Sequence, residues 1–556
     1  MILRGRHVFM DSLVAHGVEK IFGNPGTTES PLIDSLIDYP QIDYVVALHE
    51  GVAVGAASHY AQASGKTAAV SLHAAPGLGN GIGMIYGALK ANSPIIVTAG
   101  QQDTRMRLNE PVLYHDLVGM AAPVTKWSVQ AESADEIAPI MRRAWKIAND
   151  PPMGPVFVAL PINVMEQETA IAASSPATLY TAGQPAPDGV TAIAQMLASA
   201  RKPVIVAGDD IGRSGAQDEL VALAEAAGAE VWHELLHMHA PLPSRHACAK
   251  GPLPADAAGI RKALDGADVV LMIGGAFFDD VWYAPGTPFP DGARIAQIES
   301  APATLAHKLP VEIGLTGHLS DTLRRIGLAL AGNARDGEKA AAMTRYTQLQ
   351  DQKAADTAAQ RDRAARSWDR RPASMARVMA EIAQAMPQDT IVVDESITAS
   401  IDLARSLDLA GVGSYFGARG GGIGQGVAGA LGVKIAQPDR PVLAISGDGS
   451  AMYSIQSLWT AAHHDLPIVY VILANREYRV LKHNLDAFRQ RFDAGSNHPY
   501  VTMDLNGPAL DFVHLAQGMG LSAERIEDPD ALGDALRRAF DSGKPCLIEL
   551  AVEGKP

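Results

Sequence analysis

The chain has 556 residues, of which 47% are hydrophobic and 19% charged, and it contains 52 Gly and 35 Pro. This length predicts about two to four domains, and the composition is typical of a globular α/β protein with many strand-to-helix turns. The formal net charge is −15, and no basic run with interleaved aromatic residues occurs, which argues against nucleic acid and anionic membranes as partners. Small molecules are favoured as partners instead.

The sequence also argues against membrane insertion and secretion. No apolar run reaches the length of about 18 residues that a membrane span needs. Near the amino terminus, apolar residues between Val8 and Val18 recur at helical spacing, without the apolar block and cleavage site of a signal peptide. The two cysteines, Cys248 and Cys546, lie far apart, so a disulfide framework is not expected. We therefore predict a cytoplasmic protein.

Two stretches of distinct composition divide the chain. Residues 171–190 are rich in Ala, Ser, Thr and Pro, as in a linker, and residues 332–371 are charged, Ala-rich and helix-prone. The predicted domains are therefore residues 1–170, 190–331 and 372–556.

Within each block, short β-branched runs alternate with helical patterns, which is typical of parallel sheets covered on both faces. In chain order, the predicted strands are residues 44–48, 67–72, 94–100 and 155–160, then 203–208 and 268–275, then 390–395, 441–449, 468–475 and 545–552. The predicted fold class is α/β, with three doubly wound parallel-sheet domains.

The most specific pattern is a strand, a Gly-Asp-Gly-Ser turn, a helix and a second strand that ends before Asn475. Asp448 and Asn475 are 27 positions apart, which in a βαβ unit places both at the carboxyl ends of neighbouring parallel strands. Mg²⁺ prefers octahedral oxygen ligands from one or two protein groups together with phosphates and water. Asp448, Asn475 and a backbone carbonyl near Glu477 would suit such an ion. The alternative is a tight turn without a ligand.

Within that turn, Gly447 and Gly449 would let the backbone approach a diphosphate, and the next helix would offer free N–H groups to it. The segment from Gly447 to Asn475 resembles the thiamin-diphosphate signature of the pyruvate decarboxylase and acetolactate synthase superfamily. The resemblance implies thiamin diphosphate and Mg²⁺ as cofactors, with Asp448, Asn475 and Glu477 at the metal.

Two stretches upstream extend the resemblance. The Gly-rich run at residues 420–426 does not fit a dinucleotide fingerprint, but it matches the family loop that precedes the diphosphate motif, with Ile423 as the apolar residue that supports a bent cofactor. At the end of the strand at 390–395, Thr398 matches a family hydroxyl that contacts the diphosphate, whereas Ile397 departs from the usual Thr. The implied cofactor contacts are Glu395, Ser396, Thr398, Gly422, Ile423, Gly447, Asp448, Gly449, Ser450, Asn475 and Tyr478.

In the first block, Glu50 joins a strand to an apolar helix. Apolar neighbours would favour its protonated form, which suits proton exchange with a heterocycle nitrogen, whereas the alternative is a Glu placed by the helix dipole. Thiamin enzymes have a Glu at this strand end that hydrogen-bonds the aminopyrimidine and helps to generate the ylid. In the family, the residues matching Glu50 and Asp448 come from different subunits, so a homodimer is the minimal active unit and a tetramer is usual.

Residues 22–32 and 71–81 are most similar to benzoylformate decarboxylase and its near relatives. His73 matches the catalytic His of that family, although a structural His is the alternative reading from the residue alone. Thr27 stands at the position of a catalytic hydroxyl that is Ser in the family. His115 falls where some relatives carry polar groups of the substrate pocket, with a structural role equally open.

Departures from the family lie in the substrate pocket. Val281 stands where a second catalytic His is usual, and Asn484 stands where an aromatic residue is usual, while Phe416, Val480 and Leu481 would line the pocket. The resemblance implies decarboxylation of a 2-oxo acid through a ylid and an enamine. Because a missing His could slow protonation of the enamine, the alternative is an acetolactate-synthase-like carboligase or a 2-hydroxyacyl lyase acting on a 2-oxo acid or an aldehyde. A cofactor-binding protein without turnover is the third hypothesis. Whether the middle domain binds FAD or another nucleotide stays open.

Overall fold

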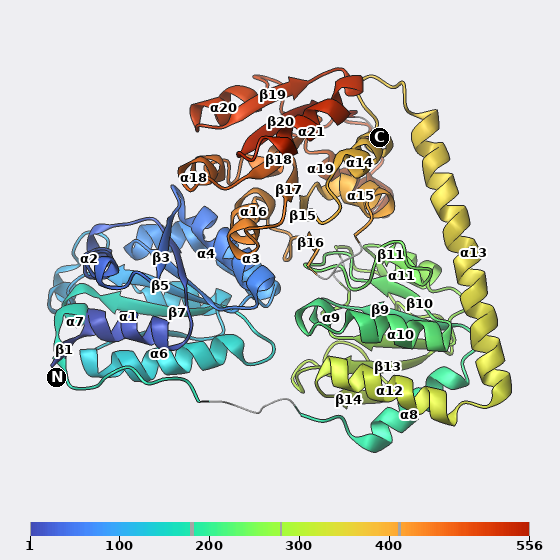
Figure 1. Ribbon diagram of the computed structural model, residues 1–556, viewed down its shortest axis with the longest axis horizontal. Coiled ribbons are helices and arrows are strands. Elements are labelled where there is room, and N and C mark those ends of the chain that lie inside the picture. The colour runs from blue at the N-terminus through green and yellow to red at the C-terminus, as the bar shows by residue number, and fades with distance from the viewer. Residues whose placement is uncertain (1, 178–182, 279–280, 410–412, 555–556) are drawn as a thin grey trace. The chain divides into compact units, whose positions relative to one another are not determined.

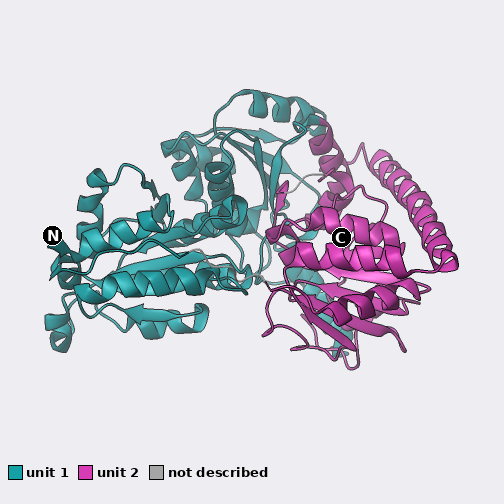
Figure 2. Cartoon of the chain, turned by 60° about the horizontal axis from the view of Figure 1, so that its bottom comes forward, with its two compact units in different colours: residues 1–178, 385–398, 418–556 teal, residues 179–384, 399–417 magenta. Residues whose placement is uncertain are grey.

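The computed structural model describes residues 2–177, 183–278, 281–409 and 413–554 (Figure 1). By its internal contacts the chain divides into two compact units (Figure 2). Unit 1 comprises residues 1–178, 385–398 and 418–556, and unit 2 comprises residues 179–384 and 399–417. Residues 178–182 of the predicted linker lie outside the described residues. Each unit is built around parallel sheets, so the predicted fold class is confirmed.

The first sheet belongs to unit 1 and has the strand order β3-β2-β4-β5-β7-β6, all parallel. Its strands are β2 (Lys20–Gly23), β3 (Asp43–Val46), β4 (Ala68–Leu72), β5 (Ile95–Gln101), β6 (Ser128–Gln130) and β7 (Val156–Pro161). Helices α1 (Gly5–Ala15) and α6 (Ala134–Asn149) pack together over one face. Because both faces are covered, β4, β5 and β7 are buried along their whole length.

A second sheet of unit 1 contains β15 (Ile391–Glu395), β17 (Val442–Gly447), β18 (Ile468–Ala474), β20 (Cys546–Ala551) and β19 (Ser522–Ile526), paired in that order and parallel. Helix α16 (Gln425–Ala436), beside this sheet, packs closely on α3 (Glu50–Ser64) of the first. A Cβ added to Gly432 would lie 1.9 Å from the carbonyl oxygen of Ala56, so only glycine permits this approach. Val46, at the end of β3, donates its N–H to His464 and accepts from the hydroxyl of Thr460.

The sheet of unit 2 has the order β11-β10-β9-β12-β13-β14. Its strands are β9 (Pro203–Ala207), β10 (Glu230–His233), β11 (Ala249–Pro252), β12 (Val269–Ile273), β13 (Arg294–Glu299) and β14 (Ile313–Thr316). Helices α8 (Pro187–Ala198), α10 (Gln217–Ala227) and α12 (Leu319–Asn333) contribute to its hydrophobic core. The helix-prone stretch at 332–371 forms the long helix α13 (Asp336–Arg366), drawn in yellow in Figure 1.

Three short strands complete the sheets: β1 (Leu3–Arg4) and β8 (Glu168–Thr169) pair antiparallel, and β16 (Tyr415–Phe416) lies beside β15. The remaining helices are α2 (Ser30–Ser35), α4 (Ala74–Lys90), α5 (Leu117–Ala121), α7 (Ile162–Glu166), α9 (Asp210–Arg213), α11 (Ala257–Ala263), α14 (Met375–Ala385), α15 (Ser400–Ser406), α17 (Asp448–Ala451), α18 (Ser457–His463), α19 (Arg479–Arg491), α20 (Phe512–Gly518) and α21 (Leu532–Asp541). Within the described ranges, no helix is both long and apolar enough to cross a membrane.

The helix predicted after the Gly-Asp-Gly-Ser turn differs from the one in the structure. A single helix was expected after the Gly-Asp-Gly-Ser turn, but the structure has two short helices, α17 and α18, separated by turns at residues 452–456. Gly, Ser and Tyr, which are weaker helix formers than Ala or Leu, are frequent between Gly449 and Ser454 and account for the interruption.

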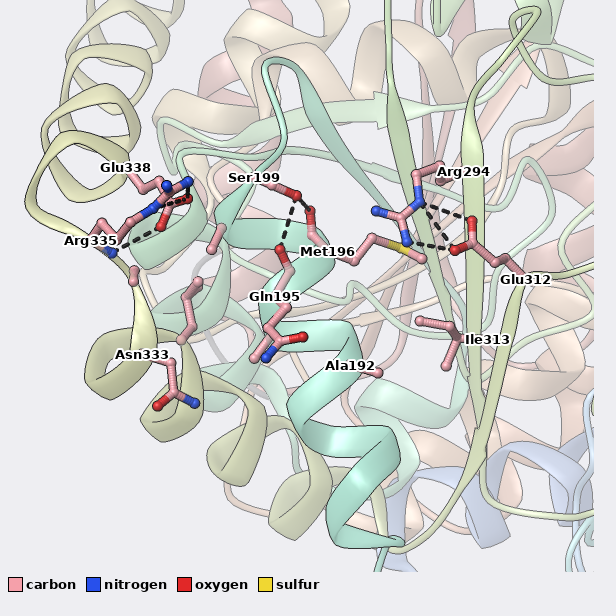
Figure 3. A pocket seen from close by; sticks show the side chains of 14 residues that line it. Ala192, Gln195, Met196, Ser199, Arg294, Glu312, Ile313, Asn333, Arg335 and Glu338 are labelled. Carbon is pink, nitrogen blue, oxygen red and sulfur yellow. Dashed lines mark hydrogen bonds and ion pairs between the residues drawn. The ribbon is translucent and has the colours of Figure 1, made fainter.

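A cavity of about 550 Å³ lies in unit 2 between the ends of α8 and α12 (Figure 3). It is lined by Arg294 and Ile313, which begin β13 and β14, and by Asn333 at the end of α12. The Arg294 guanidinium is already paired with Glu312, at 2.9 Å from Nε to Oε2. In parallel α/β sheets ligands bind at the opposite, carboxyl edge of the strands, so this cavity is not a candidate active site.

Candidate active site

Asp448 occupies the end of β17 and is held by backbone groups. Its side chain is buried, with Oδ1 accepting the N–H of Gly449 at 2.8 Å and Oδ2 accepting the N–H of Arg476 at 2.6 Å. Burial raises the pKa of the Asp448 carboxyl to about 6. Strands β17 and β18 are parallel neighbours, so Asp448 and Asn475 follow adjacent strand ends, as their spacing predicted.

The segment after Asn475 determines which atom of Glu477 is available to a cation. Arg476 accepts the N–H of Leu505 at 2.7 Å, and Tyr478 donates its N–H to Met503 at 2.8 Å. Because successive peptide groups of an extended chain point to opposite sides, the N–H and C=O of Glu477 point away from residues 503–505. The N–H of Glu477 donates to Oδ1 of Asn475 at 3.1 Å, and its carboxylate contacts Lys482. The Glu477 carbonyl is therefore the group that suits a cation beside Asn475.

The surroundings of this turn fit a diphosphate held through Mg²⁺. A carboxylate, an amide and a carbonyl oxygen form the hard, oxygen-only donor set that Mg²⁺ prefers. A Cβ added to Gly447 would meet nothing within 4 Å, which leaves open space beside the turn. At Gly449, by contrast, a Cβ would lie 2.5 Å from the ring of Tyr478, so only glycine fits beneath that ring. Ser450 is buried in the same turn.

Glu395 supports the Gly-rich loop. Its buried carboxylate accepts the N–H groups of Gly424 at 2.8 Å, Gln425 at 3.1 Å and Gly426 at 2.9 Å, at the start of α16. Burial raises the pKa of Glu395 to about 7 despite these donors. The structure thus gives Glu395 a contact with the loop, where the sequence predicted a contact with the cofactor.

The other predicted cofactor contacts differ in exposure. Both the hydroxyl and the N–H of Ser396 donate to Asp394. Thr398 and Ile423 are half-buried, and Gly422 is exposed. Ser396 is thus engaged in the turn itself, while the side chains of Thr398 and Ile423 are partly accessible to a ligand.

Three predicted site residues are directly followed by a non-glycine residue with a positive φ angle. These are Ala74 after His73, Ile397 after Ser396 and Arg476 after Asn475, with φ angles of 47°, 53° and 59°. Such conformations cost about 1–3 kcal/mol each. Positive φ angles also occur at non-glycine residues away from the site, such as Asn92 and Asp465, so this feature does not by itself mark the site.

Glu50 begins α3, at the predicted junction with the preceding strand. Its side chain is buried, and Oε2 accepts a hydrogen bond from Nδ2 of Asn80 at 3.0 Å. A Cβ added to Gly77 would lie 3.0 Å from Oε1, so the carboxylate packs against the backbone of α4. His49 caps α3 by accepting the N–H of Gly51. Glu50 is thereby fixed at the carboxyl edge of the first sheet.

His73 follows β4 and is paired with an acidic residue that sequence reasoning missed. Nδ1 of His73 lies 2.8 Å from Oε2 of Glu29, whose carboxylate is buried and also accepts the N–H of Gly100 at 2.8 Å. A Cβ added to Gly26 would lie 2.1 Å from Nδ1, so the ring lies directly on the backbone there. With Nδ1 donating to Glu29, the neutral ring keeps Nε2 as its proton acceptor.

The hydroxyl beside His73 belongs to Thr28. Its Oγ1 lies 3.3 Å from Nδ1 of His73 and donates to Glu29 at 2.9 Å, whereas the side chain of Thr27 is exposed. The sequence signal for Glu29 was an acidic residue two positions after Thr27, but its burial depends on β5, which is distant in sequence.

The predicted substrate-pocket residues fall in both units. In unit 1, His115 is exposed, and its carbonyl accepts a hydrogen bond from Gln101. On α19, Leu481 is 44% exposed, whereas Val480 and Asn484 are half-buried. In unit 2, Val281 is 60% exposed and Phe416 is buried, with its ring 5.3 Å from that of His239. The pocket itself stays a prediction.

Fold and site together define an α/β enzyme class that holds a diphosphate cofactor at the carboxyl ends of parallel strands. Comparison with known families agrees. The N-terminal TPP binding domain of the thiamine pyrophosphate enzymes matches residues 3–121, the central domain matches residues 190–326, and the C-terminal TPP binding domain matches residues 398–550. The chain belongs to the thiamine pyrophosphate (thiamin diphosphate) enzyme family.

Relatives of two reaction types cover nearly the whole chain. Benzoylformate decarboxylase from Pseudomonas aeruginosa is 33% identical over 542 residues, covering 97% of each chain. The large subunit of acetolactate synthase isozyme 3 from Escherichia coli is 25% identical and covers 100% of this chain and 95% of its own. Among solved structures, the thiamine diphosphate-dependent 4-hydroxybenzoylformate decarboxylase of Rhodococcus jostii aligns with a TM-score of 0.85, at 28% identity and 99% coverage of both chains.

Proposed function

We propose that the protein decarboxylates a 2-oxo acid with thiamin diphosphate and Mg²⁺. The observation that carries this proposal is the His73–Glu29 pair at the end of β4, because it supplies an oriented proton-transfer group in the same domain as Glu50. When bound, the cofactor supplies the electron sink for the pair that CO₂ leaves behind. Whole-chain similarity to a benzoylformate decarboxylase supports the reaction type.

Each side chain then has a distinct task. Asp448, Asn475 and the Glu477 carbonyl would hold Mg²⁺ together with the diphosphate. Glu50 would hold and exchange a proton at the aminopyrimidine end of the cofactor, and Nε2 of His73 would deliver or remove a proton at the reacting carbon. Thr27, the closest exposed hydroxyl after Gly26, is proposed to contact the substrate.

We also propose that the active form is at least a homodimer, with a tetramer expected, and that the protein is cytoplasmic. Residues 1–170, 190–331 and 372–556 are the proposed pyrimidine-binding, middle and diphosphate-binding domains. Proteins of the acetolactate synthase type are among the relatives, and Val281 stands where the decarboxylases have a second His. Carboligation or lyase activity is therefore the second candidate.

The cofactor requirement is tested by chelation and dialysis. The resulting apoprotein should be inactive and should recover only with Mg²⁺ plus thiamin diphosphate. Full activity after verified removal of both would refute the cofactor assignment.

The reaction is tested with a panel of 2-oxo acids, with and without an added aldehyde. Release of CO₂ and an aldehyde supports the decarboxylase, whereas an acyloin product supports the carboligase. We expect a medium or aromatic 2-oxo acid to be preferred because Phe416, Val480 and Leu481 are apolar. If the cofactor-loaded protein turned over none of the 2-oxo acids, both the decarboxylase and the carboligase assignments would be contradicted.

A further inference from the structure

The middle sheet has its topological switch point between β9 and β12. From β9 the chain continues to β10 and β11 on one side, and then crosses to β12, β13 and β14 on the other. In parallel α/β sheets, ligands such as dinucleotides bind in the crevice outside the strands' carboxyl ends at such a point. Here the crevice is bordered by residues 208–210, after β9, and residues 274–277, after β12.

Backbone contacts close this crevice. Gly208 donates its N–H to Ile273 at 2.9 Å, and Asp210 donates its N–H to Gly274 at 2.9 Å. A Cβ added to Gly208 would lie 2.4 Å from Cα of Gly275, so the two loops touch without room for a methyl group. The place that a pyrophosphate takes in a dinucleotide-binding domain is thus filled by the chain.

Glu234, directly after β10, supplies an anion inside the closed crevice. It is completely buried, and its Oε1 accepts the N–H of Phe277 at 2.5 Å while Oε2 accepts the N–H of Asp209 at 3.3 Å. One carboxylate therefore binds donors from both bordering loops. Backbone N–H groups at strand-to-helix turns are the donors that phosphates use in nucleotide sites.

A second buried carboxylate completes the arrangement. Glu299, at the end of β13, accepts the N–H of Gly275 and hydrogen bonds from Gln297 and Thr304. Burial raises the pKa of Glu299 to about 7. Asp209 and Asp210 also border the crevice, and their carboxylates are used by the chain: Asp209 accepts the N–H of Met238 at 2.7 Å, and Asp210 pairs with Arg213.

We propose that Glu234, assisted by Glu299, is a built-in carboxyl group that takes the place of a nucleotide phosphate, so that the middle domain binds neither FAD nor another nucleotide. The middle domain then has a structural role, and the proposed chemistry proceeds without a nucleotide cofactor. This inference does not depend on which reaction the enzyme catalyses.

The first test uses the full-length wild-type protein. An acid extract should release no FAD or adenine nucleotide, and calorimetric titration with ADP and with FAD to millimolar concentration should show no binding. Stoichiometric release of a nucleotide, or saturable binding of ADP or FAD, would overturn the proposal. Turnover of 2-oxo acids is measured separately, so failure of the proposed function is distinguishable.

The second test removes the anion. Glu234→Ala removes the carboxylate that accepts the N–H groups of Asp209 and Phe277, so we expect a lower unfolding temperature. Formate, an anion small enough for the space of the lost carboxylate, should partly restore that temperature and should not shift the wild type. Glu312→Ala is the control, because Glu312 forms an exposed ion pair with Arg294 on the other edge of the sheet. If formate stabilises Glu234→Ala no more than Glu312→Ala, Glu234 does not occupy an anion site. Should Glu234→Ala not fold, Glu234→Gln, which keeps only one acceptor oxygen, should unfold at a lower temperature than Glu312→Gln; equal unfolding temperatures would contradict the proposal.

Discussion

Lys482 should control the affinity for Mg²⁺ without touching the ion. It lies on α19, where its ammonium contacts the carboxylate of Glu477 and donates to Asp504 at 2.6 Å. The side chains of Lys482 and Glu477 are only 14% and 7% exposed, whereas that of Asp504 is 52% exposed. Lys482 thus engages the Glu477 carboxylate, and the Glu477 carbonyl is the group left for the ion.

The expected magnitude follows from these exposures. The contact with Asp504 contributes little because exposed ion pairs are worth about 0–1 kcal/mol. The contact with Glu477 is largely desolvated, and Oε1 of Glu477 has no hydrogen-bond partner among the described residues, so Lys482→Met would leave a nearly unpaired buried charge. Loss of groups that orient metal ligands typically weakens metal binding by about 10- to 100-fold. That range corresponds to roughly 1.4–2.7 kcal/mol.

The assay is a Mg²⁺ titration with excess thiamin diphosphate, followed by calorimetry for the wild type, Lys482→Met and Lys482→Arg. The Arg variant keeps the positive charge and should retain most of the affinity. Lys146→Met, which removes an exposed ion pair with Asp150, serves as the control. A folded Lys482→Met protein whose Mg²⁺ affinity equals that of the Lys146→Met protein would refute the reasoning.

Three further outcomes are expected. Glu29→Gln should lower kcat by about 10²-fold or more and shift the tautomer of His73, which ¹⁵N NMR detects; an unchanged tautomer and pH profile would show that Glu29 does not orient His73. Because the pKa of Glu395 is raised above its usual value to about 7, its protonated form favours the folded state, so stability should fall as the pH rises from about 4.5 to 7. Urea unfolding should show this slope reduced in Glu395→Gln, and an equal slope would contradict the buried assignment. Asp448→Ala should lose thiamin diphosphate, whereas Glu50→Ala should retain the cofactor but have no activity. If the site is shared between chains, mixing the two variants, with subunit exchange proven, should restore partial activity.

Much of the fold was predictable because each parallel strand is buried on both faces and reads as a continuous apolar run. Strands β5, β12 and β18 were all anticipated from such runs. The four-residue strands β2 and β14 were not among the predicted runs, whereas β3, equally short, was, because its segment continues as the apolar run at residues 44–48. The adjacency of Asp448 and Asn475 followed from a single βαβ spacing and was found.

Side-chain contacts between distant segments were not predictable in the same way. Glu29 binds Gly100 and His73, which lie 71 and 44 positions away, and nothing in its local sequence specifies either contact. Glu395 was predicted as a cofactor contact, and the strand-end position gave no sign that its carboxylate accepts the N–H groups of residues 424–426. Sequence spacing gives the strand end on which a residue lies, whereas the partner of that residue depends on how non-local elements pack.

The carboxyl edges of two sheets in this chain contain similar residues, but one edge is closed and the other is open to a ligand. At the middle sheet, a glycine brings two loops together, and Glu234 takes the backbone N–H groups that a phosphate would need. Beside Asp448, a Cβ on Gly447 would meet nothing within 4 Å. The N–H of Glu477 donates to the side-chain amide oxygen of Asn475, and the carbonyl of Glu477 lies on the same side. Both edges have acidic residues and glycines, so composition alone does not distinguish them. What separates the two edges is space: the loops at Gly208 and Gly275 touch, whereas the backbone at Gly447 leaves room for a ligand.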